Sequence, residues 1–177
     1  MKKLGFGLMR LPKTDPNVNK SVDETAVLQM MREFIDNGFT YFDTAYMYHS
    51  YTSENVVGRT LVKNFPRDSF TLADKLPTMF LKEADDMQRI FEEQLTKCCV
   101  DYFDYYMLHD VNGSNYDQTV QRLRAFDFIS KLKAEGIYAY KAYKGIDSYN
   151  KIFFGRTLLG IKIIVGEEES EEARIWK

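Results

Sequence analysis

The sequence lacks several features that would place it in a specialised class of protein. It has only two cysteines among 177 residues, Cys98 and Cys99. Adjacent residues make poor disulfide partners, so we expect a reducing, cytoplasmic location. No apolar run approaches the roughly 18–20 residues that span a bilayer, and no apolar signal-peptide segment follows Met1. We therefore expect no membrane association.

An excess of basic residues is also missing. The chain has 24 Lys and Arg against 26 Asp and Glu, for a net charge of −2. This balance offers no support for nucleic acid or an anionic membrane as a partner. What remains is a hydrophobic content of 45% and a charged content of 28%, which are typical of a soluble globular domain.

Strand-like runs alternate with helical periodicity along most of the chain. The expected strands are residues 4–9, 40–43, 69–73 and 104–108. A helix follows each one; the first begins at a capping box formed by Ser21 and Glu24 and ends at Gly38. Such alternation is typical of βα units that build a parallel sheet. Because a complete eightfold barrel needs about 250 residues, we predict an α/β fold with about four to five βα units, a partial (βα)8 TIM barrel.

The pattern divides the chain into two parts. Residues 1–136 contain the four regular βα units and are expected to form the N-terminal half of the barrel. Residues 137–177 diverge from this pattern, with weaker strand signals at 137–143 and 161–165. They end in the acidic run 167–172, which we interpret as a solvated tail.

Reactive side chains lie where the expected strands end. Asp43 ends the second strand, Lys75 follows the third, and His109 follows the fourth, while Tyr48 lies five positions after Asp43. In parallel α/β folds the carboxyl ends of the strands and the following loops build the active site. We therefore expect these four side chains at one rim of the sheet.

Together the four residues have a coherent chemistry. A tyrosine hydroxyl has a pKa near about 10 and is a weak acid at neutral pH. An ammonium group close by, such as that of Lys75, favours the phenolate and makes Tyr48 a better proton donor. Asp43 would keep the lysine charged and in place, and a neutral His109 would orient a carbonyl oxygen. Hydride would have to come from a cofactor, because no side chain supplies it.

Each of these residues alone also has a structural interpretation, as a turn residue, a packed ring or a solvated lysine. Their occurrence together, at the ends of successive expected strands, favours a role in one active site. His49, next to Tyr48, is the main rival for a catalytic histidine, although it has no strand-end placement. Gly5 and Gly7 do not form a dinucleotide-binding fingerprint, because the third glycine and the following helix are missing.

These segments resemble the aldo-keto reductase family over about residues 3–136. The resemblance is carried by four stretches of the sequence: the first strand Leu4–Leu11, the signature Gly38–Tyr48 with Ser53-Glu54 and Val57-Gly58, the lysine strand Thr71–Leu76, and the histidine strand Asp101–His109.

The resemblance implies an oxidoreductase that reduces an aldehyde or ketone to an alcohol with NADPH. It makes Tyr48 the general acid, with Lys75 and Asp43 as the residues that adjust its pKa. It makes His109 the group that orients the small-molecule carbonyl substrate. It also places Gly7, Leu8, Met9 and Asp43 near the nicotinamide ribose. The start of the chain is similar to a bacterial branch whose longer members carry an iron–sulfur domain. Two cysteines cannot supply the four thiolates of such a cluster, so no metal is expected.

Two functional hypotheses stay open at this point. The phosphate-binding motifs of the family's second half are not visible in residues 137–177. The chain is therefore either an NADPH-dependent reductase or a truncated, catalytically inactive remnant that acts only as an assembly or interaction module. In both cases a homo-oligomer that covers open sheet edges is a possible partner arrangement. The substrate and the preference for NADPH over NADH are not fixed by the sequence.

Overall fold

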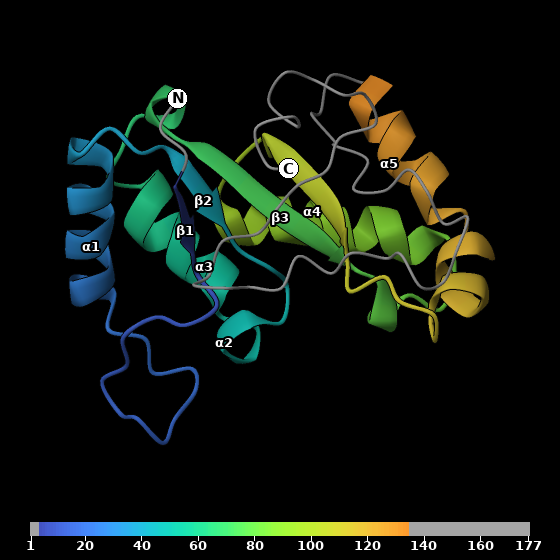
Figure 1. Cartoon of the computed structure of the whole chain (residues 1–177), viewed down its shortest axis with the longest axis horizontal. Coiled ribbons are helices and arrows are strands. Elements are labelled where there is room, and N and C mark those ends of the chain that lie inside the picture. The colour runs from blue at the N-terminus through green and yellow to red at the C-terminus, as the bar shows by residue number, and fades with distance from the viewer. Residues whose placement is uncertain (1–3, 135–177) are drawn as a thin grey trace.

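The computed structural model describes residues 4–134 of the chain. Its four strands form one parallel sheet in the order β1-β2-β3-β4, with a helical connection after each strand (Figure 1). The strands are β1 (Gly5–Gly7), β2 (Tyr41–Asp43), β3 (Thr71–Pro77) and β4 (Tyr105–His109). The α-helices are α1 (Glu24–Asp36), α2 (Tyr48–Tyr51), α3 (Ser53–Val57), α4 (Asp85–Cys98) and α5 (Ala125–Ala134). Two segments of π-helix are η1 (Gly58–Val62) and η4 (Tyr116–Gln121), and two segments of 3-10 helix are η2 (Arg67–Ser69) and η3 (Thr78–Phe80).

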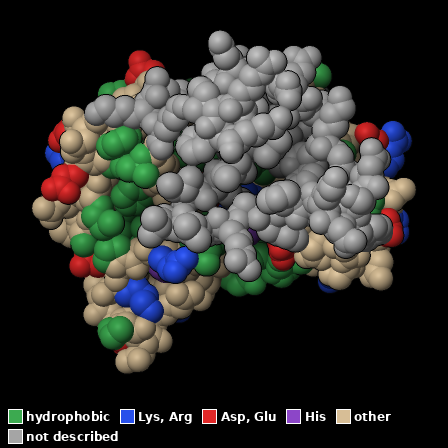
Figure 2. Space-filling model, viewed as in Figure 1, with side chains coloured by type: hydrophobic (Ala, Val, Ile, Leu, Met, Phe, Trp, Pro, Cys, Tyr) green, Lys and Arg blue, Asp and Glu red, His purple; other side chains and the backbone are tan. Residues whose placement is uncertain are grey.

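This arrangement confirms the predicted α/β class and the four βα units of a partial barrel. A fifth unit and the division at residue 137 lie outside the described residues. None of the helices within residues 4–134 is long and apolar enough to cross a membrane. On the face seen in Figure 2, basic and acidic side chains are interspersed around the margin of the described part.

β3 is longer than the sequence suggested, and this moves Lys75. The expected strand ended at residue 73, but β3 continues to Pro77, so Lys75 lies within the strand rather than after it. Every residue from 72 to 77 is buried. A strand covered on both faces needs no alternation of polar and apolar residues, and here two charged side chains, Asp74 and Lys75, occupy buried positions.

Strand register brings the polar residues to neighbouring positions. Gly7 pairs with Asp43, and Asp43 pairs with Ala73 on the adjoining strand. Further along β3, Lys75 pairs with Met107, and Pro77 pairs with His109. Because the strands are parallel, their carboxyl ends lie at one edge of the sheet, as predicted.

Helices α3 and α4 pack behind β2 and β3 (Figure 1). Alternate strand residues such as Phe42, Leu72 and Tyr106 are fully buried in the core. Phe91 of α4 meets Tyr106 edge-on, with 4.9 Å between ring centroids. Such rings bury large apolar areas, so this layer holds the helices firmly against the sheet.

Two local expectations about the helices need correction. The N-cap of α1 is Asp23, whose carboxylate accepts the Ala26 N–H, whereas Ser21 instead donates to loop carbonyls. The single helix expected after the fourth strand is instead two segments, η4 and α5, separated near Arg124, which has a left-handed φ of 57°. The expected stop at Gly38 is confirmed by its φ of 77°.

Candidate active site

All four residues predicted from the strand ends meet in one cluster. The Lys75 Nζ donates to Asp43 Oδ1 at 2.6 Å and also to the main-chain oxygen of Thr44. The same Nζ lies 5.0 Å from the centroid of the Tyr48 ring. The Tyr48 and His109 rings meet edge-on, with 5.9 Å between their centroids. Residues from β2 and α2 thus contact the buried ammonium group of β3, and His109 of β4 joins the cluster through the Tyr48 ring.

Lys75 keeps its charge although it is fully buried. Burial by itself lowers the pKa of this lysine, but the charges of Asp43 and Tyr48 and the hydrogen bond to Asp43 oppose burial. The net result is a pKa above the ordinary value for lysine. Lys75 therefore provides a fixed positive charge directly beside the Tyr48 ring.

The pKa of the Tyr48 hydroxyl is shifted in the opposite direction to the one expected from Lys75 alone. Burial raises its pKa, while the Lys75 ammonium lowers it through charge and a hydrogen bond, and Asp43 raises it again. The effect of burial is the largest, so the pKa of Tyr48 is raised overall rather than lowered. Lysine acts in the predicted direction, but the site keeps the tyrosine protonated, which is the form a proton donor needs.

His109 is positioned by the loop that follows β3. Its main-chain oxygen accepts from the Thr78 hydroxyl at 2.6 Å, and Asn115 donates to the same hydroxyl at 3.2 Å. The His109 side chain is partly exposed and faces the edge of the Tyr48 ring. A small molecule bound at this rim would therefore have an imidazole and a phenol on adjacent sides.

The four residues expected near a nicotinamide differ in the solvent exposure of their side chains and in their free hydrogen-bonding groups. Gly7 is exposed, Met9 is 54% exposed, and the Leu8 side chain is fully buried in the core. The Leu8 N–H donates to the main-chain oxygen of Asp43 at 2.8 Å, which ties the two strand ends together. The second carboxylate oxygen of Asp43 is buried and has no hydrogen-bond partner within residues 4–134. This acceptor fits a ligand that brings a hydroxyl donor, such as a sugar.

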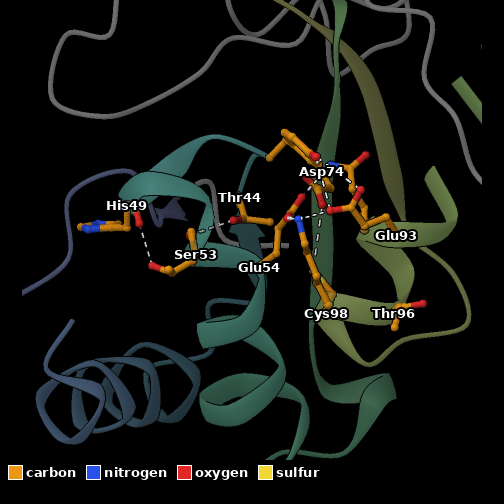
Figure 3. A network of polar contacts seen from close by, with 12 residues as sticks. Thr44, His49, Ser53, Glu54, Asp74, Glu93, Thr96 and Cys98 are labelled. Atoms are coloured by element: carbon orange, nitrogen blue, oxygen red, sulfur yellow. Dashed lines mark hydrogen bonds and ion pairs between the residues drawn. The ribbon is translucent and has the colours of Figure 1, made fainter. Parts of the chain in front are cut away.

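Sequence reasoning missed the roles of Thr44 and Ser53, although both lie in the quoted signature. The Thr44 and Ser53 hydroxyls are 2.9 Å apart. Figure 3 shows the two side chains pointing toward one another. Ser53 donates to the main-chain oxygen of Leu8 at 3.3 Å, so Thr44 is the donor to Ser53. Both side chains are fully buried. They connect β1, β2 and α3 around the carbonyl of Thr44 that receives Lys75.

His49, the rival histidine, has a structural role instead. It is only 5% exposed, and its Nε2 accepts the Leu11 N–H at 3.0 Å. Its Nδ1 lies 2.9 Å from the main-chain oxygen of Asn19 and must donate to it. Both ring nitrogens are thus used to hold the loop between β1 and α1. The residues His49, Ser50 and Tyr51 all have positive φ values, of 50°, 53° and 68°.

A parallel βα sheet with a buried lysine, a tyrosine and a histidine at its carboxyl edge is an α/β fold of the partial-barrel type with a polar site. The match to known families is more specific. The model of the Aldo/keto reductase family matches residues 3–151, and the chain therefore belongs to this family.

Two curated relatives are similar in sequence. Probable aldo-keto reductase 1 of Glycine max is 30% identical over 144 residues, covering 76% of this chain and 40% of its own length. L-galactose dehydrogenase of Arabidopsis thaliana is 28% identical over 137 residues, covering 75% of this chain and 41% of its own length. The chain thus spans less than half the length of the curated relatives it matches.

Solved structures support the fold. An aldo-keto reductase from Klebsiella pneumoniae, solved in complex with NADPH, is 24% identical with a TM-score of 0.60. The match covers 82% of this chain and 46% of that one. An aldo-keto reductase from Bacillus halodurans in its holo form is 24% identical with a TM-score of 0.57, covering 78% of this chain and 44% of that one.

Proposed function

We propose that this chain provides the catalytic residues of an NADPH-dependent oxidoreductase that reduces an aldehyde or ketone to an alcohol. The observation that carries the proposal is the buried Lys75 ammonium, held by Asp43 against the Tyr48 ring. Family membership supports it, as does the relative from Klebsiella pneumoniae that was solved with NADPH. Two free cysteines, Cys98 and Cys99, support a cytoplasmic location.

The protein groups would act on the carbonyl oxygen of the substrate. Tyr48 donates its hydroxyl proton to that oxygen as negative charge develops on it. The Lys75 ammonium stabilises the phenolate that remains, and Asp43 holds the ammonium in position. His109, whose ring meets the Tyr48 ring edge-on, orients the carbonyl oxygen by hydrogen bonding. When it is bound, NADPH supplies the hydride that reduces the carbonyl carbon.

Asp43 is the residue best suited to hold the cofactor. Its buried second oxygen is an acceptor with capacity for a ribose hydroxyl. Gly7 and Met9, at the exposed end of β1, would contact the nicotinamide side from the neighbouring strand. Leu8 would contribute through its main chain, since its side chain is in the core.

The activity is tested with the purified full chain, NADPH and a panel of small aldehydes and ketones. We expect NADPH consumption that is abolished by Tyr48→Phe, because phenylalanine keeps the ring and removes the proton. Tyr102→Phe is the matched control, because Tyr102 is an exposed tyrosine next to Phe103 and distant from β2 in sequence. Equal rates in the wild type and Tyr48→Phe would refute the role of Tyr48.

A second candidate function is an assembly module without catalysis. Within residues 4–134, β1 stands at one end of the strand order and pairs there with β2. An outer strand offers main-chain groups to another chain. We propose that two copies associate across this edge. Light scattering over a dilution series should then show a mass that falls with dilution; a constant monomer mass would exclude this candidate.

A further inference from the structure

A second group of buried ionisable side chains lies on the opposite side of β3 from the candidate active site. Asp74 and Lys75 are neighbours in this strand, so their side chains point to opposite faces. Lys75 faces Asp43 and Tyr48, whereas Asp74 faces the helix layer (Figure 3). There it lies near Glu54 of α3, and both carboxyl groups have no exposed surface. The reaction proposed above uses neither of them.

This group holds the main chain of Lys75. The Asp74 carboxyl accepts the Lys75 N–H at 2.8 Å, and the Gln94 amide donates to the Lys75 carbonyl at 3.1 Å. The same amide donates to Glu54 at 2.8 Å. The Tyr106 hydroxyl donates to the amide oxygen of Gln94 at 2.5 Å, which fixes the orientation of that amide. Four elements, α3, α4, β3 and β4, thus meet behind one lysine.

The two carboxyl groups differ in their access to positive charge. The Lys97 ammonium lies 3.4 Å from Glu54 Oε2, whereas no ion pair is formed by Asp74 among the described residues. Both carboxyl groups are fully buried, and of the two only Glu54 has an ion-pair partner within residues 4–134. Two neighbouring buried carboxylates repel each other, so one of them takes up a proton. The cation beside Glu54 favours the anion there, which leaves the proton on Asp74.

The surroundings of Asp74 agree with this assignment. Burial raises the pKa of Asp74 well above its ordinary range, and the charge of Glu54 raises it further. The ionisable groups around the pair come from every packed element: Glu54 from α3, Lys97 and Cys98 from α4, Lys75 from β3, Asp43 from β2 and Tyr106 from β4. The Cys98 thiol, 3.9 Å from Asp74, is also buried and adds no positive charge.

We propose that Asp74 and Glu54 share a single proton at neutral pH, with Asp74 as the acid and Glu54 as the anion, and that this pair positions Lys75 without presenting it with a second carboxylate. The positioning role rests on the proposed function, whereas the shared proton does not. An ionised Asp74 would raise the pKa of Tyr48, because the two negative charges would repel each other. A neutral Asp74 therefore keeps the tyrosine a stronger acid.

The shared proton has a measurable consequence for folding. Above the unfolded-state pKa of about 3.9, the unfolded chain has released the Asp74 proton, whereas the folded chain still holds it. Stability therefore falls as pH rises through this window, and the folding equilibrium constant drops about tenfold per pH unit because of this one proton. Asp74→Asn keeps an acceptor for the Lys75 N–H but has no proton to release. The ratio of the variant's folding constant to that of the wild type should grow about tenfold per pH unit between pH 5 and 7.

Two measurements on the full chain test the proposal without NADPH. Urea unfolding at several pH values should give the growing ratio for Asp74→Asn, whereas Asp85→Asn, an exposed aspartate of α4, should keep a constant ratio. A constant ratio for Asp74→Asn would overturn the proposal. Because a merely structural hydrogen bond survives in asparagine, it would not produce this pH dependence.

Infrared spectroscopy provides a second readout, and its first comparison uses the wild type alone. The native wild type at pH 7 should show the carbonyl stretch of a protonated carboxylic acid, and denaturant at the same pH should remove it. Asp74→Asn should lose this band, whereas Glu54→Gln should keep it. Absence of the band in the native wild type, or its loss only in Glu54→Gln, would overturn the assignment. Neither result depends on catalysis, so a failure here is distinct from a failure of the proposed reductase activity.

Discussion

Removing the charge of Lys75 is expected to destabilise the fold as well as the site. In Lys75→Met a side chain of similar length fills the space, but Asp43 loses its cation and the Thr44 carbonyl loses a donor. The Lys75 side chain is fully buried and that of Asp43 is 13% exposed, so water replaces little of the lost interaction. Breaking a buried ion pair by removing one partner costs about 3–5 kcal/mol. This cost is a large fraction of the total stability of about 5–15 kcal/mol that is usual for a domain.

The assay is urea unfolding followed by far-ultraviolet circular dichroism. With a urea dependence of about 2 kcal/mol per molar, the expected loss lowers the unfolding midpoint by roughly 2 M. The double variant Lys75→Met/Asp43→Asn provides the matched control, because it also removes the uncompensated carboxylate. It should be more stable than Lys75→Met alone. A loss below about 1 kcal/mol in Lys75→Met, the size expected of an exposed pair, would refute the buried-pair reasoning.

Three further predictions concern residues around the site. Ser50→Gly should raise stability by about 0.5–1 kcal/mol in thermal unfolding, because glycine adopts the positive φ of this exposed position without strain; a loss of stability would contradict this. His49→Phe should cost about 1–3 kcal/mol and speed amide hydrogen exchange at Leu11, whose buried N–H loses its acceptor; unchanged exchange would show that the loop is held by other contacts. The hydrogen bond from Arg89 and those from two main-chain N–H groups lower the pKa of Asp86 to about 2. A lowered carboxyl pKa adds stability that is present above the unfolded value of about 3.9 and is lost as pH falls through about 2. The stability of Asp86→Asn should therefore fall less steeply than that of the wild type between about pH 4 and pH 2 in acid unfolding. The same pH dependence in both proteins would argue against the hydrogen bonds to Asp86 as its cause.

Much of the site could be predicted because it follows from the order of strands. Parallel strands place their carboxyl ends at one edge, so Asp43, Lys75 and His109 could be grouped from sequence position alone. Tyr48 required the additional argument that a phenol gains acidity beside an ammonium. The extent of β3 could not be predicted, because Asp74 and Lys75 interrupt its apolar pattern and resemble the start of a loop.

The buried network behind Lys75 was not predictable by the same reasoning. In a sequence, Glu54 and Gln94 look like solvated positions of amphipathic helices, because burial of such residues depends on partners from other elements. Similarly, the engagement of both His49 nitrogens depends on a loop about thirty residues earlier in the chain, which periodicity does not place. Local patterns identify elements and their ends, whereas hydrogen-bond partners distant in sequence require the fold.

The pKa of Tyr48 depends on its burial as well as on the charge of Lys75. Lys75 does lower it, but burial of the ring and hydroxyl has the larger effect, and the sequence gives no measure of burial at the mouth of a sheet. The consequence is a tyrosine that stays protonated until a substrate oxygen develops negative charge beside it.

The strand-end cluster around Asp43 and Lys75 is expected to bind a nicotinamide cofactor next to Tyr48. Fluorescence titration of the full chain with NADPH measures this binding, with Asp43→Asn titrated in parallel. We predict saturable binding to the wild type and clearly weaker binding to Asp43→Asn. No change in NADPH fluorescence up to high micromolar concentrations of the folded wild type would contradict this expectation.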